Sequence, residues 1–401
     1  MEPLKPLMIS TGRAADGKDK YFDRPNIENK IWTKIKQKEH LLLAAPRRTG
    51  KSSILKNLER NPQGNYLVKY KAVQSVDSTN EYFKQLYKML LEDNSIFGFY
   101  DSYFKKAKGA VKSFISRVRG LSTEGIEIDP NEHIDYYLEC EHLLKALPKE
   151  FNTILLLIDE FPDVVRNISN LDKNEAIRFL QLNRDLRQGF NHANLQFVYT
   201  GSIGLGNVVS RLNRPDLIND IINIEVPPLE KKEAKEFISR LVLGLKKDKE
   251  HFEIHDDVKD CILNKESWLI PYYIQIIVEE LFDLFGTDKV ISNDSIDKAM
   301  GKIIRDRYKY QDYFENWKTR LKQAFEKNEY SCSLEALNYI SINGSIDYDT
   351  LYNLSAKHGI PDLKSITNIL EYDGYINKNA HRQYRFNSII LKEWWCINVA
   401  S

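Results

Sequence analysis

The feature that most constrains the fold is an apolar run that ends in a glycine-containing loop: HLLLAAPRRTGKSSILKNL, residues 40–58. The run predicts a buried strand and the residues after the loop suit a helix, which is the context that a phosphate-binding loop requires. In the pattern G-x-x-x-x-G-K-[ST], Gly50, Lys51 and Ser52 match, whereas Ala45 takes the place of the first glycine. Alanine adds only one methyl group, so we expect the loop to keep its shape.

Each matching residue has a role toward a chain of phosphates. Gly50 lets the backbone curl so that its N–H groups face the anion. Lys51 is expected to reach the β- and γ-phosphates, and the Ser52 hydroxyl to join a Mg²⁺ ion. The helix after the loop directs the positive end of its dipole at the same anions. The stretch therefore predicts ATP and Mg²⁺ as cofactors, bound by Ala45, Pro46, Arg47, Arg48, Thr49, Gly50, Lys51, Ser52 and Ser53. The alternative is that the stretch matches the phosphate-binding pattern by chance.

A second apolar run, NTILLLIDEFPDVV at residues 152–165, ends in two acidic residues. Uninterrupted apolar runs are typical of parallel strands covered by helices on both faces, and ligands bind at the carboxyl ends of such strands. We therefore expect Asp159 to hold Mg²⁺ through water and Glu160 to polarise the water that attacks the nucleotide. The alternative is a buried strand followed by a solvated acidic turn.

A third run, NLQFVYTGSIGL at residues 194–205, ends in the small hydroxyl residues Thr200 and Ser202. In P-loop ATPases a polar residue at this point senses the γ-phosphate, although an ordinary strand-end turn explains the pattern equally well. A helical pattern over residues 170–188 separates this run from the second. The alternation of strands and helices predicts an α/β fold with a parallel sheet.

Further stretches carry a resemblance to a known family. They are YFDRPNIENKIW (21–32), PRRTGKSSIL (46–55), FVYTGSIGL (197–205), IEVPPLEKKEAKEFISRL (224–241) and ILEYDGYINKNAHRQYRFNSIILKEWW (369–395). With these motifs the chain resembles the STAND-type P-loop ATPases, in particular their archaeal ATPase-like (MNS) branch, relatives of the AAA+ origin-recognition ATPases. The resemblance implies a P-loop core, a helical lid and a C-terminal winged helix. It also implies slow ATP hydrolysis that controls switching or assembly.

The resemblance assigns two residues to the base of the nucleotide. Arg24, with Glu28, matches an entry motif that lies against the adenine, although Asp23 and Pro25 depart from that motif. Pro271, in ESWLIPYYIQIIVEEL, matches a lid proline beside the base, but the glycine that accompanies it in the family is missing.

Two arginines follow the third run, in SRLNRPDLINDI. On this segment AAA+ relatives often carry an arginine that reaches the γ-phosphate of a neighbouring subunit. Arg211 and Arg214 are therefore candidate arginine fingers, and the alternative is a pair of surface arginines in exposed ion pairs.

The expected organisation has four parts. Residues 1–21 form an N-terminal extension, 22–228 the ATPase core with a helical basic insert at 75–150, 229–325 the lid, and 326–401 the winged helix. Within the insert, residues 104–120 contain six basic residues and no acidic ones. This segment is either a solvated helix face or a contact surface for nucleic acid or an acidic partner.

Charge and composition narrow the choice of function. Lys and Arg total 58 against 57 Asp and Glu, so no overall field favours nucleic acid, and from residue 320 onward nine basic residues face nine acidic ones. Four widely spaced cysteines indicate neither a zinc site nor disulfides. No apolar run could span a bilayer and no signal peptide is evident, so we expect a cytoplasmic protein without a membrane partner.

Three functions are compatible with these observations. The first is an ATP-driven switch that assembles with itself or with a separate effector protein. The second is a DNA-associated initiator or loader that uses the winged helix and residues 104–120. The third is a binding module whose nucleotide is structural, and Glu160 weighs against it because a scaffold has no need of that acid.

Overall fold

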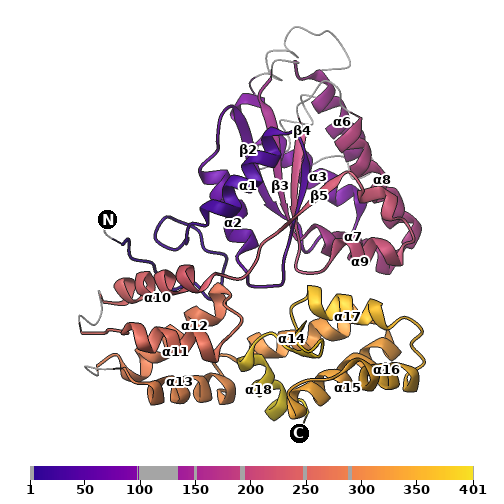
Figure 1. Ribbon diagram of the computed structural model, residues 1–401. Helices are drawn as coiled ribbons and strands as arrows, with labels where there is room; N and C mark the ends of the chain where they lie inside the picture. The colour runs from indigo at the N-terminus through magenta and orange to yellow at the C-terminus, as the bar shows by residue number, and fades with distance from the viewer. Residues whose placement is uncertain are drawn as a thin grey trace.

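The computed structural model describes residues 4–96, 98, 134–148, 151–189, 195–246, 251–287 and 291–400. A parallel sheet forms the centre of the first half of the chain (Figure 1). Its strand order is β2-β3-β4-β1-β5. The strands are β1 (His40–Ala44), β2 (Tyr66–Ala72), β3 (Thr153–Asp159), β4 (Leu195–Thr200) and β5 (Ile221–Glu225).

The three strands expected from apolar runs, β1, β3 and β4, are the three inner strands of the sheet. Successive residues of a strand point to opposite faces, and both faces are covered. Leu155 and Leu157 of β3 pack with helices α1 (Pro25–Lys36) and α2 (Lys51–Arg60). The residues between them pack with helices on the other face, which are α3 (Thr79–Leu91), α6 (Tyr136–Ala146), α7 (Phe161–Leu171), α8 (Lys173–Gln188) and α9 (Leu205–Arg211). Two-sided burial explains why these strands read as continuous apolar runs.

The second half of the chain is mainly helical and lies below the sheet in Figure 1. It begins with a helical unit, defined as α10 (Lys231–Leu245), α11 (Asp256–Lys265), α12 (Pro271–Phe285) and α13 (Asn293–Arg305). Helix α14 (Gln311–Ala324) leads to a C-terminal unit, defined as α15 (Lys327–Asn343), α16 (Tyr348–Lys357), α17 (Leu363–Tyr372), the antiparallel hairpin β6 (Ile376–Lys378) and β7 (Tyr384–Phe386), and α18 (Ile389–Asn398).

Both units share one hydrophobic core, which runs from Phe237 in α10 to Trp395 in α18. A buried hydrogen bond also joins them, because the Glu266 carboxylate accepts the N–H of Ile390 at 3.2 Å, in the first turn of α18. Helices followed by a two-stranded hairpin match the order of elements expected for a winged helix. The basic segment 104–120 lies outside the described residues. Among the described residues, no helix is long and apolar enough to cross a membrane.

Candidate functional site

The loop between β1 and α2 has the curled backbone that the sequence predicts. Gly50 has a φ of +97° and Arg48 a φ of +68°. Residues other than glycine rarely adopt positive φ angles, so Arg48 marks an unusual turn of the backbone. The Thr49 hydroxyl donates to the Pro46 carbonyl at 2.9 Å and closes the turn. Lys51 is the first residue of α2, and its ammonium donates to the carbonyls of Ala45 at 2.7 Å and Pro46 at 2.8 Å. These bonds orient the lysine over the loop, where burial lowers its pKa to about 8.

A cavity of about 250 Å³ opens beside this loop. Most of the predicted binding residues line it: Arg24, Arg47, Arg48, Thr49, Gly50, Lys51, Ser52, Ser53, Glu160, Ser202 and Pro271. Arg13 and Lys20 also line it, so six cationic residues surround a space whose only acidic lining residue, in the described part of the chain, is Glu160. Such a concentration of positive charge at the N-terminus of a helix favours a polyanionic ligand.

Arg24 also lines the cavity. The first turn of α1 is fixed by Glu28, whose carboxylate accepts the Arg24 N–H at 2.9 Å and the Tyr21 hydroxyl at 2.7 Å. The Arg24 guanidinium donates to the Pro228 carbonyl at 3.3 Å, while its Nε and Nη1 atoms are buried without a partner among the described residues. Burial lowers the pKa of this arginine. Unsatisfied donors beside a cavity are suited to a polar ligand.

The two arginines of the loop point toward the helical half of the molecule. Arg47 donates to Asn316 in α14. The Arg48 guanidinium lies over the ring of Tyr272, 4.8 Å from its centroid, and 5.4 Å from that of Tyr313. The loop thereby contacts both the helical unit and α14. A change in the conformation of the loop would therefore alter its contacts with both.

The carboxyl ends of β3 and β4 bring the predicted polar residues together. Asp159 accepts hydrogen bonds from the Tyr70 hydroxyl at 2.9 Å and from the Thr200 hydroxyl. Glu160 has a φ of +63°, and its carboxylate accepts the Ser202 N–H at 2.7 Å and the Ser202 hydroxyl at 2.8 Å. Asp159 and Thr200 lie behind the cavity wall, whereas Glu160 and Ser202 form part of it.

Asp163, in the first turn of α7, interacts electrostatically with Glu160, the acid at the cavity. It is 1 % exposed, and burial followed by the charge of Glu160 raises its pKa to about 7. Burial acts in the same direction on Glu160, but the charge of Lys51 and the hydrogen bonds from Ser202 hold the pKa of Glu160 below its ordinary value. The pKa of Asp163, which also pairs with Arg166 at 2.6 Å, therefore lies above that of Glu160, and Glu160 is the acid of the two that ionises first.

The C-terminal unit packs directly on the phosphate-binding loop. Gly374 follows α17 with a φ of +88°, and a β-carbon there would lie 2.7 Å from the β-carbon of Pro46 and 2.6 Å from the Trp268 ring. The preceding Asp373 is buried, which raises its pKa to about 7, and it lies in the electrostatic field of Arg320 and Lys51. Arg320 itself has a buried Nη2 atom without a partner among the described residues.

Sequence reasoning did not find Asp163, Arg320, Asp373 or Gly374. Asp163 follows Glu160 by three residues, so its place on the same helical turn was the one available signal. The other three lie more than 260 residues beyond the loop in the sequence. No local sequence pattern indicates that residues so far apart lie close together in the fold.

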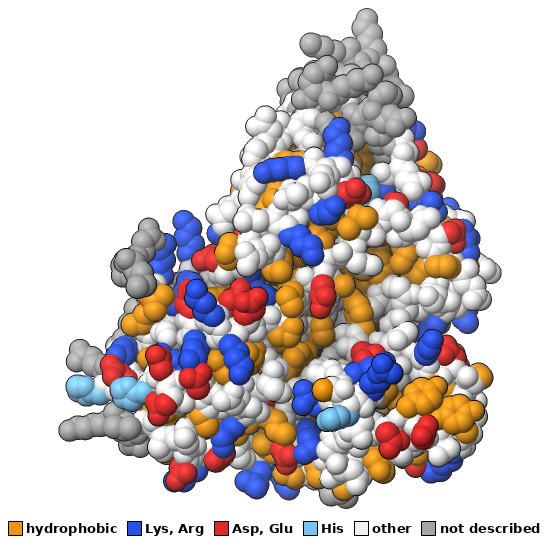
Figure 2. Space-filling view, viewed as in Figure 1, with side chains coloured by type: hydrophobic (Ala, Val, Ile, Leu, Met, Phe, Trp, Pro, Cys, Tyr) orange, Lys and Arg blue, Asp and Glu red, His pale blue; other side chains and the backbone are white. Residues whose placement is uncertain are grey.

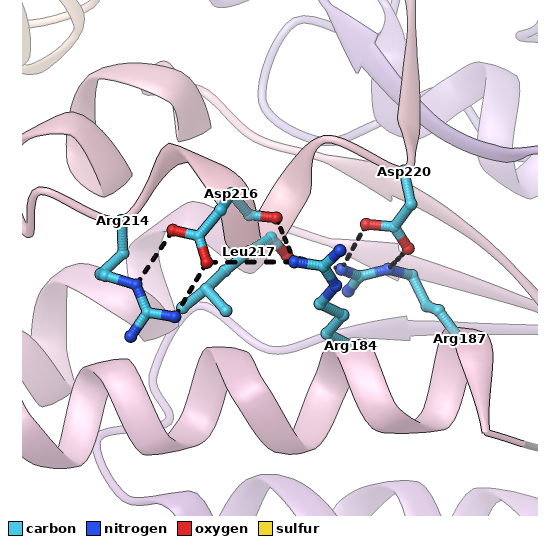
Figure 3. A network of polar contacts seen from close by, with 6 residues as sticks. All are labelled: Arg184, Arg187, Arg214, Asp216, Leu217 and Asp220. Carbon is cyan, nitrogen blue, oxygen red and sulfur yellow. Dashed lines mark hydrogen bonds and ion pairs between the residues drawn. The ribbon is translucent and has the colours of Figure 1, made fainter.

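The two candidate arginine fingers lie away from the cavity and pair with acids of the same chain. Arg211 donates to Glu329 of α15 at 2.8 Å. Arg214 donates two hydrogen bonds to Asp216, at 2.9 and 2.8 Å, next to the ion pair of the buried Arg187 with the partly buried Asp220 (Figure 3). Both arginine side chains remain about a third or more exposed, at 42 % and 33 %.

A Mg²⁺ ion would fit the chemistry of this edge. The Ser52 hydroxyl lines the cavity, and the Asp159 carboxylate lies behind its wall, where it would reach an ion through water; both supply the hard oxygen atoms that Mg²⁺ prefers. Within the described ranges, no group of three or more His, Cys, Asp or Glu side chains could hold a metal on its own. An ion here would therefore take its other ligands from water and phosphate, as Mg²⁺ usually does.

Comparison with known proteins bears on the fold. The sequence matches no family model and no curated protein. Among solved structures, the chain is similar to the Walker-type ATPase PABY2304 of Pyrococcus abyssi, with 17 % identity, a TM-score of 0.59 and coverage of 98 % of both chains.

Two other similar structures have TM-scores below 0.5. One is the ORC2 protein of Aeropyrum pernix, with 11 % identity, coverage of 98 % and 100 %, and a TM-score of 0.48. The other is a mutant of RuvB of Thermotoga maritima, with 14 % identity, coverage of 90 % and 91 %, and a TM-score of 0.42. At these identities the likeness concerns the fold alone, and the expected α/β fold of a P-loop ATPase is confirmed.

Proposed function

We propose that the chain binds ATP with Mg²⁺ and hydrolyses it slowly, and that the nucleotide state controls its assembly with itself or with a separate effector protein. The observation that carries this proposal is the cavity beside the phosphate-binding loop, with six cationic residues and one acid in its lining. In this proposal Lys51 binds the β- and γ-phosphates, and Ser52 and Asp159 hold Mg²⁺, which neutralises the phosphate charge.

Hydrolysis would depend on Glu160. Its ionised carboxylate accepts two hydrogen bonds from Ser202, so it is a base that can orient a water molecule and take up its proton. Thr200 ends β4 and Ser202 follows two residues later, and we assign them the role of sensing the γ-phosphate through Asp159 and Glu160.

Switching would use the contact between the C-terminal unit and the loop. Gly374 lies against Pro46, and Arg47 donates to α14. A third contact between the halves is the ion pair of Arg211 with Glu329. A change at the phosphates would therefore be transmitted to residues 311–398, which we regard as α14 and a winged helix that reports the nucleotide state.

DNA association remains the second candidate, with weaker support. The face in Figure 2 shows acidic and basic side chains interspersed over the half that holds the helical unit and the C-terminal unit. Non-specific affinity for DNA requires a concentration of positive charge to neutralise phosphates. Helix α17, in the position of a recognition helix, carries Lys364 as its only cation, beside Glu371.

Nucleotide binding and turnover test the proposal directly. Wild-type protein should bind a fluorescent ATP analogue and release phosphate, and Lys51→Ala should lose at least a hundredfold in turnover because the phosphates lose a charged ligand. Lys36→Ala, an exposed lysine of α1, is the matched control and should behave as wild type. Equal turnover by the Lys51 variant would refute the assignment.

Assembly is measured by size-exclusion chromatography with light scattering, in ADP and in a non-hydrolysable ATP analogue. A change of mass between the two nucleotides supports the switch. A complex that forms with a DNA duplex only in the ATP analogue would support the second candidate instead.

A further inference from the structure

Residues 7–20 form a loop, here called the N-terminal loop, that begins on the helical unit and ends at the core (Figure 1). Leu7 is fully buried in the core of the helical unit, and its N–H donates to the Arg240 carbonyl of α10 at 2.8 Å. The approach is so close that a β-carbon on Gly244 would lie 2.0 Å from the Leu7 carbonyl oxygen. The Met8 N–H donates to the Asp19 carbonyl at 2.7 Å and closes the loop on itself.

The same loop is also bound to the phosphate-binding loop and α2. The Thr11 carbonyl accepts the Arg48 guanidinium at 2.8 Å, and the Ala15 N–H donates to the Ser53 hydroxyl at 2.9 Å. Asp16 forms ion pairs with Lys56 and Arg60 of α2. A further bond, from the Ser10 N–H to Gln275 of α12 at 2.7 Å, ties the loop to the helical unit. The N-terminal loop thus connects both sides of the cavity.

Between these anchors the loop forms one wall of the cavity, through residues 10–15. Arg13 is part of this wall, and among the described residues its guanidinium forms no ion pair. Its backbone is held in place, because the Arg13 carbonyl accepts the Ser10 hydroxyl at 3.2 Å. A cation without an acidic partner, facing a cavity already lined by Arg24 and Lys51, adds to the attraction for a polyanion.

We propose that the N-terminal loop is a gate of the nucleotide site: Arg13 binds the phosphate chain of the nucleotide, and the loop must leave its anchors before the nucleotide is released. This inference rests on the proposed function and adds to it a residue and a step. Because the loop is bound to α10 and α12 on one side and to α2 on the other, the step also ties nucleotide release to the position of the helical unit.

Gly244→Ala releases the loop without touching the nucleotide-binding residues. The added methyl group would collide with the backbone of Leu7, while alanine is the more favourable residue inside α10 itself. Gly206→Ala is the matched control, because Gly206 is also helical and a β-carbon there meets nothing within 4 Å. Arg13→Ala removes the proposed contact, and Lys18→Ala, an exposed lysine of the same loop outside the cavity lining, is its control.

The measurement is the dissociation rate of a fluorescent ADP analogue, followed by stopped flow after mixing with excess unlabelled ADP. Gly244→Ala should accelerate dissociation about tenfold or more. Arg13→Ala should weaken affinity about tenfold, the effect of one lost charge-assisted hydrogen bond. Both controls should match wild type. In limited trypsin digestion, nucleotide should protect the bond after Arg13 in the wild type and should no longer protect it in Gly244→Ala.

The outcomes separate this inference from the proposed function. If wild type binds the analogue, Lys51→Ala does not, and Gly244→Ala and Arg13→Ala both behave as wild type, the gate is wrong and the proposed function stands. If wild type binds no nucleotide, both are wrong. Should Gly244→Ala fail to fold, the exposed Arg13→Ala variant decides alone, since wild-type affinity in that variant overturns the proposed contact.

Discussion

Asp373→Asn should change how the stability of the protein depends on pH. Asp373 is 5 % exposed, one of its carboxylate oxygens has no partner among the described residues, and burial raises its pKa from 3.8 to about 7. Between pH 4 and 7 the unfolded chain has released this proton and the folded chain retains it. The free energy of unfolding must therefore fall as pH rises through this window, and this contribution becomes constant above about pH 7.

The size of the effect follows from the shift. Each pH unit within the window changes the free energy of unfolding by about 1.4 kcal/mol per proton, so Asp373 accounts for about 4 kcal/mol in all. Asp163 has a pKa raised to about 7 by the same cause, and it would keep its own contribution in the variant. Asp373→Asn should thus reduce the slope of the free energy of unfolding against pH by the contribution of one proton, and the contribution of Asp163 should remain.

Urea unfolding followed by tryptophan fluorescence at pH 5, 6, 7 and 8 gives the free energy at each pH. Between pH 5 and 7, the difference between variant and wild type should widen by about 3 kcal/mol in favour of the variant. Asp349→Asn, at an exposed acid of the same unit, is the control. Parallel curves for wild type and Asp373→Asn would refute the reasoning that this carboxyl is protonated in the folded protein.

Three further results are expected. Glu160→Gln should bind ATP with nearly normal affinity and lose about a hundredfold or more in turnover; phosphate release within twofold of wild type would remove Glu160 from the role of base. Gly374→Ala should weaken the docking of the C-terminal unit on the phosphate-binding loop, lowering the free energy of unfolding by about 1–3 kcal/mol, and an unchanged urea midpoint would contradict the close contact. If Arg211 or Arg214 acts on a neighbouring subunit, its alanine variant should lose about a thousandfold in turnover and regain activity on mixing with Lys51→Ala, whereas full activity of both arginine variants at every protein concentration excludes a finger.

The inner strands and the residues that end them could be predicted because their physical causes are local. Strand β3 is buried on both faces, so its sequence is an uninterrupted apolar run before Asp159 and Glu160. Strands β2 and β5 are edge strands with several partly exposed or exposed residues, and their mixed sequences gave no comparable signal. Gly50 could be predicted because the loop requires a backbone conformation that glycine adopts readily.

The parts of the site that escaped prediction depend on contacts between distant segments. Nothing in the sequence around Asp373 indicates that the fold brings it within the electrostatic field of Lys51. Arg48 illustrates the same limit within the motif itself, because its guanidinium lies over Tyr272 rather than over the loop. The roles of the predicted site residues remain predictions that the variants above can test.

The anchors of the N-terminal loop also bear on the order in which the protein is made. Leu7 and Ser10 bond to Arg240 and Gln275, partners that lie 233 and 265 residues further along the chain. At about 5–20 residues per second, these partners leave the ribosome roughly 10–50 seconds after the loop itself. The phosphate-binding loop and α2 are complete long before then, so during synthesis the site still lacks the lining that the helical unit supplies through Phe237, Pro271, Tyr272 and Gln275.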